Sequence, residues 1–375
     1  MKAGSPAPFA YDLPLLFAVL FLIGTGIVMV YSASSALALK TFGSDLFFLK
    51  RQAVFALIGI VTLIVCCRIP LPVYRTMTYP LLALAFLLLV LIQTTGLGFS
   101  AGGSTRWLRV GGFTLQPSEP ARLALILYLA YSMSKKQPRI KTFSIGFLPH
   151  IIVLALFSVV ILIQPDFGSV VILAVITWIM LFVGGARLLH LSSAFAALLP
   201  IFYLLMINAE YRLRRIMSFL DPWQYPTDEG YQVVHSLMAF GTGGLFGTGI
   251  GNSYQKLFYL PEPHTDFIFS VVGEELGLLG VMVILGLYGI ILWRGTHIAR
   301  NADSTFAMIL STGITVAVLL QVCINMGVAL GLLPTKGLTL PFLSYGGSSL
   351  IVNMASMGIL MNIGAGHMRK AGFHG

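Results

Sequence analysis

Long apolar runs, repeated along almost the whole chain, are the feature that most constrains its fold. Hydrophobic residues make up 57% of the 375 positions and charged residues only 10%, which leaves too few polar residues to cover a soluble globule. A bilayer is crossed by about 20 apolar residues, and the runs are continuous rather than alternating, which predicts helices rather than a β-barrel. Ten spans are expected, at about residues 13–32, 52–68, 79–97, 119–134, 145–164, 168–185, 189–208, 266–293, 305–330 and 347–366. We therefore predict an all-α polytopic membrane protein, with residues 1–375 forming a single integral membrane domain.

The distribution of charge sets the predicted topology. An even number of spans places both termini on one side, and the basic residues of several short loops fall on that side, which the positive-inside rule makes cytoplasmic. The formal net charge is +10, but scattered basic residues are explained better by topology and anionic lipid phosphates than by nucleic acid. The three cysteines lie inside apolar runs and indicate neither a disulfide nor a metal site. Three outer loops are unusual, 98–118, 209–265 and 331–346, and most of the acids also fall outside, so we expect a polar site at the outer face.

Asp266 is the leading candidate for a catalytic group. It lies where a polar loop meets an apolar run, directly after His264 and Thr265. A carboxyl group that is half removed from water tends to have a raised pKa, which suits a group that accepts a proton near neutral pH. The alternative is that Thr265 or Asp266 caps the helix that follows. Glu274 and Glu275 lie about two turns further in, roughly 12 Å along the helix axis, so we expect them to face a polar cavity or a basic residue.

The fourth predicted span begins with an acid and a base on one helix face, Glu119 and Arg122. The two can simply pair within the bilayer, or Arg122 can line a polar cavity while Glu119 holds it in place. Asp166, in a QPDFG sequence between two spans, is either a third member of this cavity or a turn and helix cap.

Basic residues of the outer loops are candidates for binding an anion. Arg106 and Arg109 lie close to the membrane in the first of these loops, and Lys336 lies between two prolines in the last. A lysine held in a stiff loop can meet a diphosphate as a point charge. Three further arginines follow the seventh span: Arg212, Arg214 and Arg215. Positive charge on the translocated side opposes the topology rule, so the explanation is either an anionic ligand or contact with lipid headgroups.

Five sequence blocks contain most of these residues: PEPHTDFIFSVVGEELG, QPSEPARLALI, QPDFGSVVI, YRLRRIMSFLDPW and GLLPTKGLTLPFLSYGGSS. In sequence and in order they resemble the signature blocks of the SEDS family of peptidoglycan glycosyltransferases, and the resemblance covers nearly every span. DPW, GNSYQKLFYLPE and PTKGLTLPFLSYGGSS resemble the cell-division branch more than the elongation branch. By motif, the family's essential aspartate falls on Asp266, its essential lysine on Lys336, and its paired acid and base on Glu119 and Arg122. SEPAR departs from the usual SELAK, and arginine in place of lysine changes the geometry of that pair.

The resemblance implies a transferase that polymerises lipid II, a disaccharide-pentapeptide on undecaprenyl diphosphate, at the outer face of the bacterial cytoplasmic membrane and at the division septum. Asp266 is then the general base. The expected substrate-binding residues are Lys336, Arg106, Arg212, Arg214, Arg215, His264, Glu119, Arg122 and Asp166. A divalent cation, Mg or Mn, can assist the diphosphate, although no dedicated site is evident. The implied partners are a class B penicillin-binding transpeptidase such as FtsI and other division proteins of the membrane.

Two other classes of function fit the composition. The chain can be a transporter that flips lipid II along the polar groups inside its spans, Glu119, Arg122, Glu274 and Glu275. It can also be a division scaffold without activity of its own. A transporter needs polar groups that are accessible from both faces, whereas here they concentrate at the outer face, which favours the enzyme.

Overall fold

A computed structural model describes residues 11–96, 98–101, 104–110, 113–207, 214, 217–225, 230–257 and 260–371. In chain order its elements are α1 (Leu13–Phe42), α2 (Phe47–Arg68), α3 (Leu71–Thr94), β1 (Gly98–Ala101), β2 (Ser104–Val110), β3 (Phe113–Leu115), α4 (Ser118–Lys135), η1 (Gln137–Arg139), η2 (Phe143–Phe147), α5 (Leu148–Ile163), α6 (Phe167–Val183), α7 (Leu188–Ile207), η3 (Pro222–Gln224), α9 (Tyr231–Gly243), α10 (Ile268–Arg300), α11 (Thr305–Ala329) and α12 (Gly347–Ala371).

Each of the ten predicted spans corresponds to a helix, so the predicted all-α membrane fold is confirmed. Seven stretches in the described part of the chain are long and apolar enough to cross a bilayer: α1, α2, α3, Phe143–Ile163 (η2 with α5), α10, α11 and α12. The apolar parts of α6 and α7 are shorter, and the 18 residues of α4 carry three charges. The count of ten spans therefore stays a prediction for these three helices.

Three short strands between α3 and α4 were not predicted. They form an antiparallel sheet in the order β1-β2-β3, with Leu108 of β2 opposite Leu115 of β3. The seven residues of β2 alternate between its two faces, so that Leu108 is buried while its neighbour Arg109 is exposed. The same alternation places Arg106 on the face of Leu108, toward the protein.

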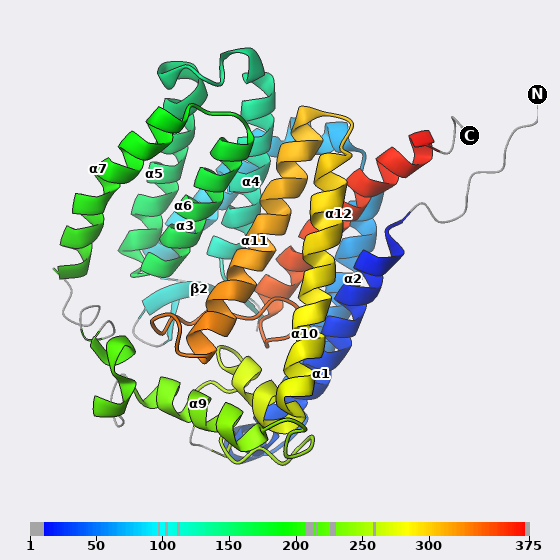
Figure 1. Cartoon of the computed structure of the whole chain (residues 1–375), viewed down its shortest axis with the longest axis vertical. Coiled ribbons are helices and arrows are strands. Elements are labelled where there is room, and N and C mark those ends of the chain that lie inside the picture. The colour runs from blue at the N-terminus through cyan, green and yellow to red at the C-terminus, as the bar shows by residue number, and fades with distance from the viewer. Residues whose placement is uncertain are drawn as a thin grey trace, which may run out of the picture.

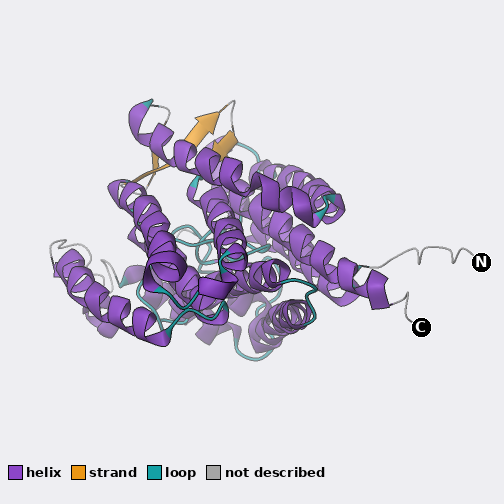
Figure 2. Cartoon of the chain, turned by 90° about the horizontal axis from the view of Figure 1, so that it is seen from above, coloured by secondary structure: helices purple, strands orange, loops and turns teal. Residues whose placement is uncertain are grey.

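Figure 1 shows that the helices form a bundle with two different ends. At one end α1 begins and α12 finishes. At the other end lie the sheet, α9, which runs across the bundle rather than along it, and the loop between α11 and α12; we call this the loop end. Seen along the bundle, the strands lie at the margin and loops lie among the helices near the middle (Figure 2). The loop end therefore brings polar backbone into the interior of an apolar bundle.

The pairing of α1 with α10 is fixed by polar contacts near both ends. Asp12 caps the first turn of α1 and forms an ion pair with Arg294 of α10, with 2.8 Å between Oδ2 and Nη2. Toward the loop end, Ser32 of α1 donates to the Glu275 carboxylate of α10 at 2.7 Å. α10 is broken at Gly277, whose φ of 64° and ψ of −167° are not helical. The residues before this break, 268–276, are almost entirely buried, whereas those after it include exposed apolar residues such as Leu279 and Met282.

Candidate active site

Asp266 lies directly before α10, with its carboxylate against the loop that carries Lys336. A β-carbon built on Gly337 would lie 2.6 Å from Asp266 Oδ2, so the two segments touch. Burial raises the pKa of Asp266 to about 7, and the Glu262 carboxylate adds to this effect, while Arg106 and Lys336 oppose it. Asp266 makes no helix-capping bond of the kind considered from the sequence. The structure therefore presents a carboxylate that exchanges a proton near neutral pH.

Lys336 extends from its loop onto the first turn of α6. A β-carbon on Gly168 would overlap the Lys336 Cε and Nζ atoms, so the lysine occupies the space that this glycine leaves open. Its Nζ atom is buried and has no hydrogen-bond partner among the described residues. Burial lowers the pKa of Lys336 to about 8, with Asp166 and Glu119 opposing the decrease and Arg106 and Arg122 adding to it. A buried ammonium group without a partner is costly, which marks this position as one where an anion is expected.

Arg106 approaches the same place from β2. Its Nη2 donates to the Pro165 carbonyl at 2.7 Å, its Nη1 lies 3.9 Å from Asp166 Oδ1, and its Nε is buried without a partner in the described part of the chain. Asp166 meanwhile caps α6 by accepting from the Ser169 N–H at 3.1 Å and the Ser169 hydroxyl at 2.6 Å. The cap considered from the sequence is therefore observed, and the same carboxylate lies near Arg106; a role of Asp166 in a shared polar cavity stays a prediction.

Glu119 and Arg122 form the predicted ion pair, with 2.7 Å between Oε2 and Nη2, and both side chains are buried. Arg122 also donates to Asn353 Oδ1 of α12 at 3.3 Å, and Asn353 donates to Ser349 at 3.2 Å. Ser349 in turn accepts from Thr339 of the Lys336 loop at 3.0 Å. The pair is therefore connected to the candidate site through polar side chains rather than isolated in lipid.

The loop from residue 330 to residue 346 is held by bonds to its surroundings. Ser344 accepts from the Leu340 N–H at 2.7 Å and donates to the Thr265 carbonyl at 2.6 Å, next to Asp266. The Asn325 side chain of α11 donates both to the Asp266 carbonyl and to the Leu338 carbonyl. Phe342 is held at a φ of 68°, a value uncommon for a residue with a side chain. The two loops that carry Asp266 and Lys336 thus share one backbone scaffold.

His264 and the arginines after the seventh span contribute less to this arrangement. The His264 ring is buried, 4.5 Å from the Phe48 ring and 5.7 Å from the Tyr345 ring, and its carbonyl accepts from the Tyr345 N–H. The ring packs against aromatic side chains, but its Nδ1 is buried without a partner among the described residues, so its predicted contact with a substrate stays a prediction. Arg214 occupies an exposed position, while Arg212 and Arg215 lie outside the described residues.

Glu275 meets a basic residue, as expected, whereas Glu274 is held by backbone and hydroxyl donors of a loop. Lys256 lies 2.7 Å from Glu275 Oε1 and also donates to Ser32 at 3.0 Å. The Tyr254 N–H donates to Glu274 at 2.9 Å, and the Ser253 hydroxyl donates to the same carboxylate. We call Ser32, Ser253, Lys256, Glu274 and Glu275 the inner lock. Its carboxylates already have donors, so they do not form an open polar path.

Sequence reasoning missed Lys256 and Asn325. Lys256 is 19 positions from Glu275 in an irregular loop, so no helical or strand period relates them. Asn325 is one of two amides, with Gln321, in a mostly apolar helix, and their presence there was the only available signal. Among the described residues, no three of His, Cys, Asp and Glu are grouped in a way that can hold a metal ion. The assistance by Mg or Mn stays a prediction.

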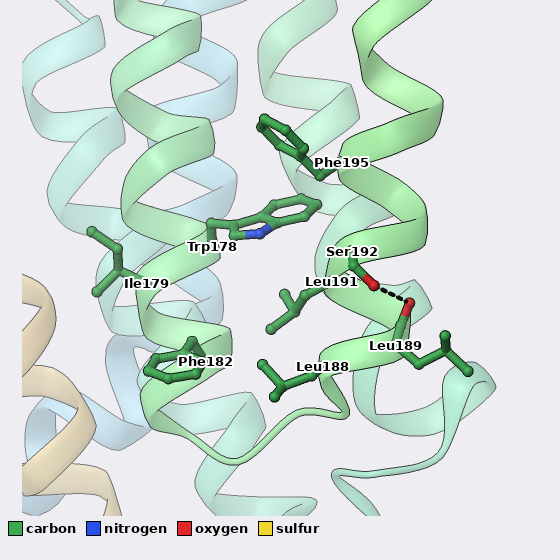
Figure 3. A pocket seen from close by; sticks show the side chains of 8 residues that line it. All are labelled: Trp178, Ile179, Phe182, Leu188, Leu189, Leu191, Ser192 and Phe195. Atoms are coloured by element: carbon green, nitrogen blue, oxygen red, sulfur yellow. Dashed lines mark hydrogen bonds between the residues drawn. The ribbon is translucent and has the colours of Figure 1, made fainter.

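An apolar groove lies between α6 and α7 (Figure 3). Its volume is about 620 Å³. The residues that line it are Trp178, Ile179, Phe182, Leu188, Leu189, Leu191, Ser192 and Phe195. The Ser192 hydroxyl donates to the Leu189 carbonyl, so even this polar group is satisfied within the helix. The groove begins at the end of α6 that is far from Lys336, so α6 connects the two places.

Comparisons with known proteins match nearly the full chain. A model of a cell cycle protein family, FtsW/RodA/SpoVE, matches residues 13–369. A probable peptidoglycan glycosyltransferase FtsW from Trichlorobacter lovleyi is 50% identical over 356 residues, covering 95% of this chain and 93% of the relative. A chain from a peptidoglycan synthase complex that coordinates polymerization and crosslinking is similar with a TM-score of 0.79 and 29% identity, covering 96% of this chain and 99% of its own. The rod shape determining protein RodA of Thermus thermophilus gives a TM-score of 0.71 and 29% identity, covering 96% and 98%.

Proposed function

Because the chain belongs to the FtsW/RodA/SpoVE family of cell cycle proteins, we propose that it is a peptidoglycan glycosyltransferase that polymerises lipid II for the division septum. The observation that carries the proposal is the position of Asp266 against the Lys336 loop, with a carboxylate that titrates near neutral pH beside a buried ammonium group that has no partner among the described residues. This combination provides one base and one unused cation, which transfer from a sugar diphosphate requires.

In the proposed reaction the 4-hydroxyl of one sugar attacks the anomeric carbon of another, which leaves from its diphosphate with inversion. A carbon–oxygen bond to the acceptor forms, the carbon–oxygen bond to the diphosphate breaks, and Asp266 takes the hydroxyl proton. A diphosphate leaves as a stable anion, so the second carboxyl group that protonates the leaving group in glycosidases is not required. One carboxylate is therefore sufficient at this site.

The leaving diphosphate belongs between Lys336, Arg106 and the N-terminus of α6. Lys336 Nζ and Arg106 Nε are buried cationic donors that have no partner among the described residues, and Lys336 lies against the first turn of α6. Charge-assisted bonds to phosphate and a helix N-terminus both favour an anion. Asp166 already compensates part of the helix dipole, so the side-chain cations supply most of the attraction.

The prenyl chain of the substrate is assigned to the groove of Figure 3. Its lining is apolar except for one satisfied serine, and α6 leads from the proposed diphosphate site toward it. Several of its residues, including Phe182 and Leu189, are exposed on the outside of the bundle, where they meet lipid tails in a membrane. A lipid substrate can then enter sideways without leaving the bilayer.

Orientation and partners follow from the same proposal. The loop end faces outward, both termini are cytoplasmic, and the protein acts with a class B penicillin-binding transpeptidase that crosslinks its product. The support is the positive-inside pattern and the similarity to a chain from a complex that coordinates polymerization and crosslinking.

The test is to supply the purified protein, with and without the transpeptidase partner, with labelled lipid II and to separate the products by size. Glycan chains are expected. A lipid II flippase is the alternative, and it would move labelled lipid II across vesicles while making no polymer. The satisfied carboxylates of the inner lock argue against that path.

A further inference from the structure

We propose that Asn325, about one turn before the end of α11, is the residue that positions Asp266 and Lys336 relative to each other during the reaction. This inference rests on the proposed function, because it concerns the same two groups. It assigns to Asn325 no contact with the substrate.

The argument begins with the bonds of one amide group. Asn325 Nδ2 donates to the Asp266 carbonyl at 2.8 Å and to the Leu338 carbonyl at 2.6 Å. The second acceptor lies two residues after Lys336. Both partners are carbonyl oxygens, which fixes the NH₂ group on this side of the amide. A single side chain therefore uses both of its N–H bonds to hold the two loops at one spacing.

Asn325 differs from the other groups that join these loops. Ser344 and Tyr345 also bond to the Asp266 loop, through the Thr265 and His264 carbonyls, but they belong to the Lys336 loop itself. Asn325 belongs to neither, because it lies on α11, and it is almost completely buried. Among the described residues, Asn325 is the side chain that connects both loops to the helices of the bundle.

The residue type is unusual for its position. Asn325 Oδ1 is buried without a partner among the described residues, so packing alone would favour a leucine of similar size. Gln321, one turn earlier on α11, is also fully buried, and neither atom of its amide has a partner in the described part of the chain. Gln321 thus has the same burial and a similar amide without the two loop contacts. It is a matched control.

The expected consequence is a change in catalysis with a particular pH signature. The groups that act on the Asp266 carboxylate are Glu262, Arg106 and Lys336, of which the two cations lower its pKa. If the loops separate, Lys336 moves away and the pKa of Asp266 rises further. The acid limb of the activity profile then moves to higher pH. A residue that matters only for folding would change the amount of active protein but leave this limb in place.

The experiment compares Asn325→Leu, Asn325→Asp and Gln321→Leu with the wild-type protein in the lipid II assay, with its partner present, over a range of pH. We expect both Asn325 variants to keep a KM for lipid II within a few-fold of wild type, to lose on the order of 10²-fold in kcat, and to show the raised acid limb. Gln321→Leu is expected to match wild type in kcat and in pH profile.

Wild-type kcat and pH dependence in both Asn325 variants would overturn the inference, as would an equal loss in Gln321→Leu. Failure of both Asn325 variants to fold would also overturn it, because Asn325 would then serve the fold. These outcomes differ from failure of the proposed function, which is seen when the wild-type protein itself makes no polymer.

Discussion

The candidate site and the inner lock are two groups of charges at opposite ends of one buried helical segment, residues 268–276 of α10. Directly before the segment, Asp266 lies against the loop that carries Lys336, and Lys336 Nζ has no hydrogen-bond partner among the described residues. At its far end, Glu275 is bonded to Lys256 and Ser32, and Glu274 is bonded to the backbone and side chain of a loop. The charged groups of the inner lock all have hydrogen-bond partners, whereas Lys336 of the candidate site has none among the described residues.

The difference teaches how buried charge in a membrane protein can be assigned to fold or to function. A buried ion pair with all its hydrogen bonds costs little further free energy and holds two segments together. A buried cation without a partner destabilises the protein and is retained only where a ligand completes it. Depth in the bundle does not distinguish the two groups, since both lie at the loop end. The two groups differ in whether their charged atoms have hydrogen-bond partners.

The largest expected effect on activity comes from a change in the candidate site. Asp266→Asn keeps the size of the side chain but removes its ability to accept the proton, so polymerisation should fall by roughly 10²-fold to 10⁴-fold. Folding and binding to the transpeptidase partner should remain, as measured by gel filtration and co-purification. Near-normal glycan synthesis by the folded variant would show that Asp266 is not the base, and the candidate site could then no longer be assigned to function in contrast to the inner lock.

Lys336 should come next. Lys336→Ala removes the cation proposed for the diphosphate, whereas Lys336→Arg keeps a positive charge of different shape, so the alanine variant should lose more activity, on the order of 10-fold to 10²-fold. The melting temperature should change little or increase in the alanine variant, because a costly buried charge is removed. Full activity in both variants would show that the loop acts only as structure.

In the inner lock, loss of the cation should lower the stability of the protein, unlike the loss of Lys336. Lys256→Met leaves the Glu275 carboxylate buried without its cation, at a cost of about 3 to 5 kcal/mol of stability. Lys256→Met combined with Glu275→Gln removes both charges and should recover much of the loss. Thermal unfolding in detergent measures both variants. Strictly additive losses would mean that the two side chains do not interact and that the lock is not a unit.

The smallest effect is a pH dependence of the wild-type protein. Asp266 must be deprotonated, so activity should rise as pH increases through about 7, and Lys336 must be charged, so activity should fall as pH increases through about 8. The profile of kcat/KM is thus a narrow bell with its maximum between these values, several-fold higher than at pH 6 or 9. A flat profile over this range would contradict both assignments.

Local rules predicted what is local in this structure. The ten helices follow from apolar runs, the Glu119–Arg122 pair from an i, i+3 spacing, and the cap at Asp166 from its turn. Each of these depends on neighbours within about one helical turn. The position of Asp266 at the edge of an apolar run was also evident from the sequence.

The partners that could not be predicted come from distant segments. Lys256 meets Ser32 across more than two hundred residues of chain, and Asn325 joins two loops from a third element. Arg106 and Arg109 could not be separated without recognising β2 as a strand, whose alternation turns one toward Asp166 and the other outward. Such contacts depend on how helices pack, and no period in the sequence encodes that.

The polar contacts that join α1 to α10 also set a fixed length along the bundle. Asp12, the N-cap of α1, and Ser32 are 20 residues apart, which is about 30 Å at the rise of an α-helix, and Arg294 and Glu275 meet these two residues from α10. That length equals the thickness of the hydrocarbon core of a typical bilayer. In a thicker or thinner membrane, this length therefore no longer matches the hydrocarbon core, and one of the two charged ends lies at a different depth. The Glu275 end continues into the buried segment that leads to Asp266, so the contacts that fix this length also connect the span to the position of the candidate carboxylate.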